Sequence, residues 1–146
     1  DNRWSRPDIK TTQLLPNVLA KTEANKKGAF EGIFIDSDGY ITEGSSSNIW
    51  IINDNNEIIT RAIDGQILSG ITRKTIAQFA KLNNLIVKEE KFTKEQLYKS
   101  KEVFLTSASS FVTPIIKVDD IEINNGKIGQ MSISLRNLYF SKLHNN

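Results

Sequence analysis

FEGIFIDSDGYITEGSSSNIWIINDNNEIITR, residues 30–61, consists of apolar segments separated by polar turns, and this pattern decides the fold class. Ile33 and Ile35 precede Asp36-Ser37-Asp38-Gly39, a turn sequence that predicts a β-hairpin with glycine at the position of positive φ. A second turn cluster, residues 53–56, separates the strands expected at 48–52 and 57–61. The pattern in residues 30–61 therefore predicts a β-sheet.

Helical spacing of apolar residues appears on both sides of these strands. It predicts helices at 15–27, where Pro16 suits the first turn, and at 72–83. The remaining expected elements are a strand at 85–88, a short helix at 94–99, strands at 102–106 and 113–118, and a closing helix at 128–143. Because the sequence contains no repeat or linker, we expect one α+β domain over residues 1–146.

The composition excludes several classes of function. The chain has 146 residues, no cysteine, 38% hydrophobic and 25% charged residues and a net charge of +2, as expected for one globular domain. Lys and Arg number 19 and Asp and Glu 17, so no basic excess points to nucleic acid or an anionic membrane. The longest apolar runs are far shorter than the ~20 residues that span a bilayer. We expect neither partner.

Conventional catalytic sets are poorly supported. The single histidine, His144, lies in the terminal residues, where we expect fraying. Without a second histidine or any cysteine, a Ser/His/Asp nucleophile system and a transition-metal site both lack their usual residues. We therefore expect no metal.

Three small, polar segments could bind an anion: residues 42–48, 68–72 and 106–110. Gly70-Ile71-Thr72 is the most specific of them, because it enters a predicted helix whose first amides are unpaired and attract a phosphate. The alternative is that Thr72 is an ordinary N-cap. Composition alone also leaves Glu43 as an exposed acid at a strand end and Lys10 as a solvated lysine.

In this order and spacing the segments resemble the C-terminal half of the class IV (fold type IV) pyridoxal-phosphate aminotransferases. The Ile9-Lys10 and Glu43–Asn48 segments are most similar to those of the D-amino-acid aminotransferases. The branched-chain aminotransferases and aminodeoxychorismate lyase share the framework but differ in these loops. The resemblance implies the α+β, C-terminal cofactor-binding domain of this family. It also implies that the family's smaller N-terminal domain is absent from this chain, which we expect to be inactive alone.

The resemblance implies a role for each matching residue. Lys10 would bond to the aldehyde of pyridoxal 5'-phosphate and later carry the substrate proton, while Glu43 would pair with the protonated pyridine nitrogen. Residues expected near the ring are Leu68, Ser46 and Ser47, and those expected at the phosphate are Gly70, Ile71 and Thr72. We expect Lys10, Glu43 and Thr72 to line one groove.

Two positions depart from the family pattern. Ala108 stands where a threonine hydroxyl often binds the phosphate, so Ser107, Ser109 or the backbone of this segment, Ala108 included, would have to replace it. Phe111 replaces a frequent acidic residue and leaves the shape of the substrate pocket open.

The implied function is transamination between a D-amino acid such as D-alanine and a 2-oxo acid such as 2-oxoglutarate, by a cytoplasmic homodimer. The alternatives are an aminodeoxychorismate lyase or a branched-chain aminotransferase on the same scaffold, and a non-catalytic isolated domain. Contacts that select D or L substrates would belong largely to the N-terminal domain.

Overall fold

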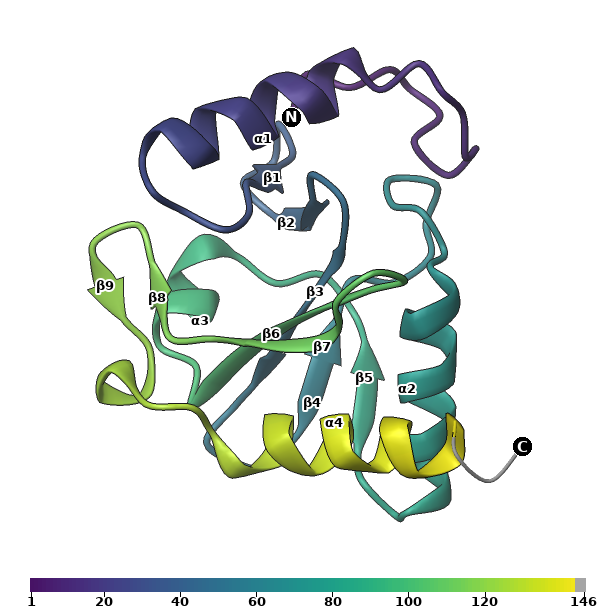
Figure 1. Ribbon diagram of the computed structural model, residues 1–146, viewed down its shortest axis with the longest axis vertical. Coiled ribbons are helices and arrows are strands. Elements are labelled where there is room, and N and C mark those ends of the chain that lie inside the picture. Colours follow the sequence, from purple (N-terminus) through teal and green to yellow (C-terminus); the bar gives the residue numbers. More distant parts are fainter. Residues whose placement is uncertain (144–146) are drawn as a thin grey trace.

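The computed structural model describes residues 1–143, and a five-stranded mixed sheet forms its centre (Figure 1). The strand order is β5-β4-β3-β6-β7. The strands are β3 (Asn48–Ile52), β4 (Ile58–Thr60), β5 (Val87–Glu89), β6 (Glu102–Ser107) and β7 (Phe111–Ile115). Only β4 and β5 are parallel, and α2 (Ile71–Leu82) supplies the crossover that a parallel pair requires.

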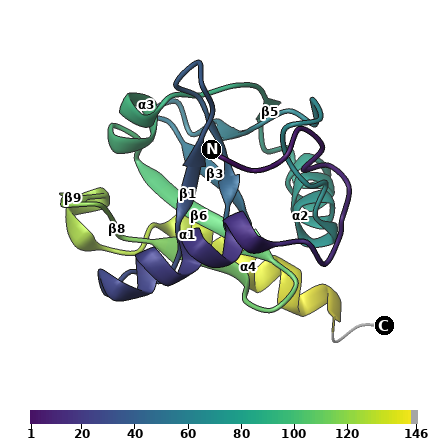
Figure 2. The same ribbon diagram turned by 90° about the horizontal axis from the view of Figure 1, so that it is seen from above.

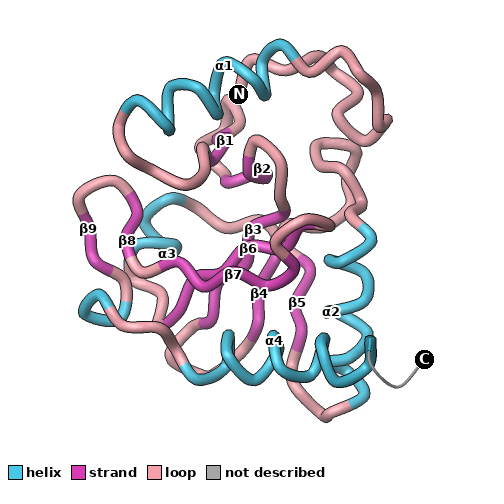
Figure 3. Tube along the Cα trace, viewed as in Figure 1, coloured by secondary structure: helices cyan, strands magenta, loops and turns pink. Residues whose placement is uncertain are grey.

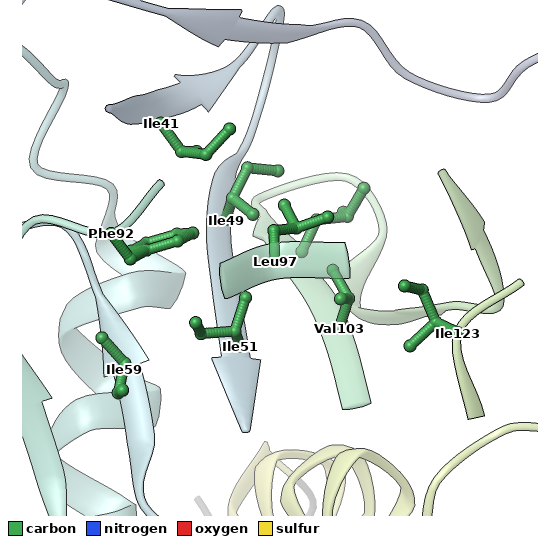
Figure 4. Packing of buried hydrophobic residues seen from close by; sticks show 9 residues of the cluster. Ile41, Ile49, Ile51, Ile59, Phe92, Leu97, Val103 and Ile123 are labelled. Carbon is green, nitrogen blue, oxygen red and sulfur yellow. The ribbon is translucent and has the colours of Figure 1, made fainter. Parts of the chain in front are cut away.

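Each face of the sheet carries a hydrophobic core, because successive side chains of a strand point to opposite faces. Ile49 and Ile51 of β3 pack with Phe92 and Leu97 on one face, under α3 (Lys94–Tyr98) and Ile41 (Figure 4). Trp50 of β3 lies in the core of the other face. That face is covered by α2 and α4 (Gln130–Leu143) (Figure 1).

The N-terminal part lies at one end of the sheet and contributes Ile41 to one of the two cores (Figures 1 and 2). It contains α1 (Leu15–Lys26) and the hairpin of β1 (Ile33–Ile35) and β2 (Ile41–Gly44). Ala24 is the one described residue of α1 that is buried, whereas Leu15, Val18 and Leu19 are exposed. This helix therefore has an apolar face that the described residues do not cover.

The predicted helices and the strands expected at 33–35, 48–52 and 102–106 are confirmed to within two residues. Gly39 has φ +86°, as expected for the hairpin turn. The closing helix begins at Gln130 because the Glu102 carboxylate accepts hydrogen bonds from the amides of Met131 and Ser132. His144 lies outside the described residues.

One strand prediction is wrong. The segment expected as a single strand at 113–118 is divided: β7 ends at Ile115, and β8 (Lys117–Val118) pairs with β9 (Ile121–Glu122) in a separate two-stranded sheet. The turn between them contains Asp119 at φ 51°, and a 3-10 helix, Asn124–Gly126, follows β9. No helix within residues 1–143 has the length and apolar character needed to cross a membrane.

Candidate active site

A groove lies where the loop before α1 meets the end of β2, and its lining includes Lys10, Glu43 and Leu68. We call it the Lys10–Glu43 groove. Most residues that line it lie in loops, and the chain before α1 runs beside the loop between β4 and α2 (Figure 3). The groove has a volume of about 60 Å³, room for roughly two water molecules.

Glu43 is buried at the end of β2, so the interpretation of this residue as an exposed acid is wrong. Its Oε1 accepts a hydrogen bond from Arg3 Nη1, and its Oε2 accepts from Asn48 Nδ2 at 3.1 Å and from the Leu68 amide at 3.0 Å. Burial raises the pKa of the Glu43 carboxyl to about 7, although the charge of Arg3 and the donated hydrogen bonds oppose this shift.

Sequence reasoning missed Arg3. Its side chain is 4% exposed, and its guanidinium group lies 4.6 Å from the centre of the Phe34 ring. Besides Glu43, it donates to the Asp1 carboxylate at 2.6 Å and to the Gln66 carbonyl at 3.1 Å. The contact with Glu43 joins residues 40 positions apart, and no local sequence pattern signals it.

Lys10 is exposed and lies in the loop that precedes α1. Within residues 1–143 its ammonium group has no hydrogen-bond or ion-pair partner. Because Lys10 and the buried Glu43 carboxylate line the same groove, one ligand there could contact both groups.

Thr72 does not line this groove, and its interpretation as an N-cap is wrong. α2 begins at Ile71, Gly70 is the N-cap, and no side chain caps the first amides. Thr72 is instead buried in the first turn, where its hydroxyl donates to the Ser107 carbonyl at 3.0 Å. The structure thus brings the three predicted anion-binding segments together: 68–72 contacts 106–110 here, and it contacts 42–48 through Leu68.

Two features distinguish the start of α2. Ser69 Oγ is buried and has no hydrogen-bond partner among the described residues. At Gly70, a Cβ atom would come within 2.4 Å of Asn48 Oδ1, so the close approach of these two segments requires glycine.

The segment 107–110 forms a compact turn between β6 and β7. Ser107 Oγ lies 2.7 Å from Ser110 Oγ and 3.3 Å from Ser109 Oγ. Phe111 follows at φ 61°, and its ring packs against Tyr139. Ala108 contributes only backbone to this turn, while Ser107 and Ser109 contribute hydroxyls.

Ser46 and Ser47 follow Glu43 in the loop between β2 and β3. Their hydroxyls donate to the carboxylate of Glu31, at 2.9 and 3.0 Å. Sequence reasoning did not single out Glu31, since nothing local distinguishes it from a surface acid. No group of three or more His, Cys, Asp or Glu in the described part of the chain is arranged to hold a metal ion.

The model of the family described as amino-transferase class IV matches residues 1–118. This chain belongs to the class IV aminotransferases. The D-alanine aminotransferase of Listeria innocua is 40% identical over 143 residues, which are 98% of this chain and 49% of that protein. The D-alanine aminotransferase of Staphylococcus aureus (strain N315) is 46% identical over 136 residues, 93% of this chain and 48% of that protein.

Solved structures of class IV aminotransferases have the same fold. The branched-chain amino acid aminotransferase of Escherichia coli superposes with a TM-score of 0.85 at 30% identity, covering 96% of this chain and 49% of that one. The enzyme of the same type from Thermobaculum terrenum, in its PLP form, gives a TM-score of 0.89 at 28% identity, covering 96% and 46%. The expected α+β fold of this family is confirmed, and the chain spans about half the length of these relatives.

Proposed function

We propose that this chain is the cofactor-binding part of a pyridoxal-phosphate-dependent aminotransferase acting on D-amino acids such as D-alanine, with a 2-oxo acid such as 2-oxoglutarate as acceptor. The observation that carries the proposal is the shared groove of Lys10 and Glu43. The identity of 40% and 46% to two D-alanine aminotransferases, over nearly the whole chain, supports this substrate class.

The residues present suit pyridoxal 5'-phosphate. Amides at the start of α2 are uncapped, Ser69 Oγ lacks a partner among the described residues, and the backbone of the 107–109 turn contacts that helix start through the Ser107 carbonyl. The residues that would hold the phosphate are Gly70, Ile71, Thr72, Ser107, Ala108 and Ser109. Leu68 would pack on the ring. When bound, the cofactor supplies an electron sink for the carbanion that forms when the substrate loses its Cα proton.

Glu43 has the hydrogen-bonding capacity for a ring nitrogen. A carboxylate offers about four acceptor sites, and Arg3, Asn48 and Leu68 fill three of them. The remaining site can accept from a protonated nitrogen, and in this buried position the charge-assisted bond is stronger than it would be in water.

Lys10 supplies the reactive amine in this proposal. It would bond to the cofactor and would then carry the proton removed from the substrate, and its amine is available for both roles because it has no other partner within the described residues. A ring is larger than the 60 Å³ of the groove. We therefore expect part of the loop before α1, including Trp4, to move when the cofactor binds.

The proposal extends to the longer protein, in which a second domain completes the substrate site within a cytoplasmic homodimer. The coverage of about half of each relative's length supports a missing part of this kind. A cationic anchor for the substrate carboxylate, which orients Cα over Lys10, would come from that part.

The direct test is to incubate the chain with pyridoxal phosphate, reduce it with borohydride and map the labelled peptide. We expect the label on Lys10, and a label on Lys21 or Lys26 instead would contradict the assignment. This experiment requires only this chain.

A branched-chain substrate is the second candidate, because solved structures similar to this chain include branched-chain aminotransferases. The longer enzyme should be offered D-alanine and L-leucine separately with 2-oxoglutarate, and aminodeoxychorismate alone. Glutamate formed with D-alanine supports the proposal. Glutamate formed only with L-leucine would contradict it in favour of a branched-chain aminotransferase. Formation of 4-aminobenzoate from aminodeoxychorismate would contradict it in favour of a lyase.

A further inference from the structure

Glu31 lies between α1 and β1, and one carboxylate there accepts hydrogen bonds from three consecutive serines. Ser45 Oγ donates to Oε1, while Ser46 Oγ and Ser47 Oγ donate to Oε2 at 2.9 and 3.0 Å. The Glu31 side chain is 5% exposed, and Lys21 Nζ lies 3.5 Å from Oε1. A nearly buried charge held in this way has a specific structural role, because its removal would leave the hydroxyls without their acceptor.

Three consecutive side chains can meet one group only where the chain turns, since neighbouring residues of a strand point in opposite directions. The turn here is closed by a hydrogen bond from the Gly44 amide to the Ser47 carbonyl at 2.7 Å. A Cβ atom at Gly44 would lie 2.2 Å from Ser47 Oγ and 3.1 Å from Glu31 Cγ. The absence of a side chain at Gly44 therefore lets the turn close around the Glu31 carboxylate.

This turn connects two residues of the candidate active site. Glu43 precedes it and Asn48 follows it, and Asn48 Nδ2 donates to Glu43 Oε2 at 3.1 Å. The turn sets the separation between these two side chains. Its position relative to the groove is also fixed, because Asn17 Nδ2 donates to the Ser45 carbonyl at 2.9 Å.

We propose that Glu31 is a positioning residue: by holding the three serine hydroxyls it fixes the turn between Glu43 and Asn48, and so keeps the Glu43 carboxylate buried at the groove. The importance of this role for catalysis rests on the proposed function, whereas the geometric role does not.

The same hydrogen bonds determine what the serines can do for a ligand. A serine hydroxyl has one proton, and each of these serines gives it to Glu31. Toward the cofactor ring, Ser46 and Ser47 can then act only as hydrogen-bond acceptors. An anionic ligand atom would therefore gain nothing from them.

Glu31 remains charged while Glu43 titrates. Burial raises the pKa of the Glu31 carboxyl, but the serine hydroxyls and the charge of Lys21 outweigh burial and hold this pKa below its usual value. The pKa values of the Glu31 and Glu43 carboxyls are thus displaced in opposite directions.

The experiment follows the titration of the Glu43 side-chain carboxyl by NMR in the chain without cofactor. In Glu31→Gln the turn loses its anionic acceptor, so Glu43 becomes more hydrated and its protonation midpoint falls by about one pH unit, a tenfold change in the equilibrium. Glu23→Gln is the control, since Glu23 is 61% exposed and contacts only Lys27. It should leave the Glu43 midpoint unchanged.

Ser46→Ala is the second variant, and it keeps the experiment decisive if Glu31→Gln does not fold. It removes a single hydroxyl from an exposed residue and should lower the Glu43 midpoint by a smaller amount, about a twofold change in the equilibrium. A Glu43 midpoint that is unchanged in the folded variants overturns the proposal. Because no cofactor is present, this result is independent of whether borohydride labels Lys10.

In the longer enzyme, Glu31→Gln should lower kcat about tenfold and change KM for the amino acid little, since no substrate contact is lost. A rise in KM with unchanged kcat would overturn the link to Glu43 and leave the labelling of Lys10 untouched.

Discussion

The central strand β3 and the loop before α1 are held in opposite ways. Every residue of β3 is buried, and five consecutive pairs join it to β6. The loop before α1 has no regular secondary structure and is tied to the rest by Arg3, which contacts Glu43 and Gln66. Glu43 is tied to β3 by the hydrogen bond that it accepts from Asn48, whereas Lys10 belongs to a segment held by few polar contacts.

The difference shows which part of the site can adjust to a ligand. Trp4, Ile9 and Leu14 of the loop are 50%, 43% and 44% exposed, whereas Trp50 of β3 is fully buried. Local stability follows the number of buried apolar contacts. The loop can thus move to admit a cofactor while the carboxylate opposite stays in place.

The largest effect is expected at the loop. Lys10→Ala in the longer enzyme should reduce transamination by at least about 10³-fold, because no other amine can serve both as covalent anchor and as proton carrier. Steady-state rates with D-alanine measure this. Lys26→Ala, on the exposed side of α1, is the control and should retain full activity. Comparable losses in both variants would show that Lys10 has no special role.

The two tryptophans test the comparison directly. Trp50→Ala should lower the free energy of unfolding by about 3–5 kcal/mol, because it opens a cavity next to Phe104, with which Trp50 stacks. Trp4→Ala should cost less than about 1 kcal/mol, since Trp4 is half exposed. Urea unfolding of the chain measures both. Equal losses would mean that the loop is packed as firmly as the sheet.

Glu43 makes the stability of the folded chain depend on pH. Its pKa is raised to about 7 in the folded chain, so the folded state binds the proton more tightly than the unfolded state does. The resulting stability is fully present below the ordinary glutamate pKa and is lost as the pH rises through 7. The loss amounts to about 3 kcal/mol at most, because a pKa difference of one between the folded and unfolded states corresponds to ~1.4 kcal/mol.

Unfolding experiments between pH 4.5 and 7.5 measure this loss. In Glu43→Gln the decline over this window should disappear, whereas Glu23→Gln should retain it. Glu31 does not produce it, because its lowered pKa acts at more acidic pH. An identical decline in Glu43→Gln would show that another group titrates here.

The smallest effect concerns the contact between α2 and the 107–110 turn. Thr72→Val keeps the shape but leaves the Ser107 carbonyl without its donor, and should cost about 1 kcal/mol of stability. Thr75→Val removes a hydroxyl that bonds only within α2, to the Ile71 carbonyl, and should cost less. Thermal unfolding of both variants compares them. Equal shifts would indicate that the Thr72 contact adds nothing beyond helix propensity.

The spacing of apolar residues was sufficient to predict several helices and strands. The spacing in 15–27 and 72–83 and the apolar segment 48–52 correspond to α1, α2 and β3. The division of 113–118 was missed because no glycine or proline lies between Ile115 and Lys117, where the chain bends, and Asp119 adopts positive φ without a distinctive neighbour.

The sequence alone offered Gly70 to Thr72 as a candidate site, whereas the candidate residues of the groove came only from a resemblance. Lys10 and Glu43 were identified in this way, and both line one groove. Arg3 and Glu31 were missed because each acts through contacts with residues far along the chain, at Glu43 and at Ser45 to Ser47. Thr72 was assigned to the wrong helix position, since helix starts cannot be placed to one residue from the sequence.

The single parallel pair, β4 and β5, has a consequence for the order in which the chain folds. β3 and β4 are joined by a short turn and can pair early, whereas β5 can pair with β4 only after the chain that forms α2 has closed a long loop. Non-local pairing of this kind is slow. We therefore expect the edge strand β5 to be incorporated late in folding. The first turn of α2, with Gly70 to Thr72, would then acquire its final position only when most of the sheet already exists.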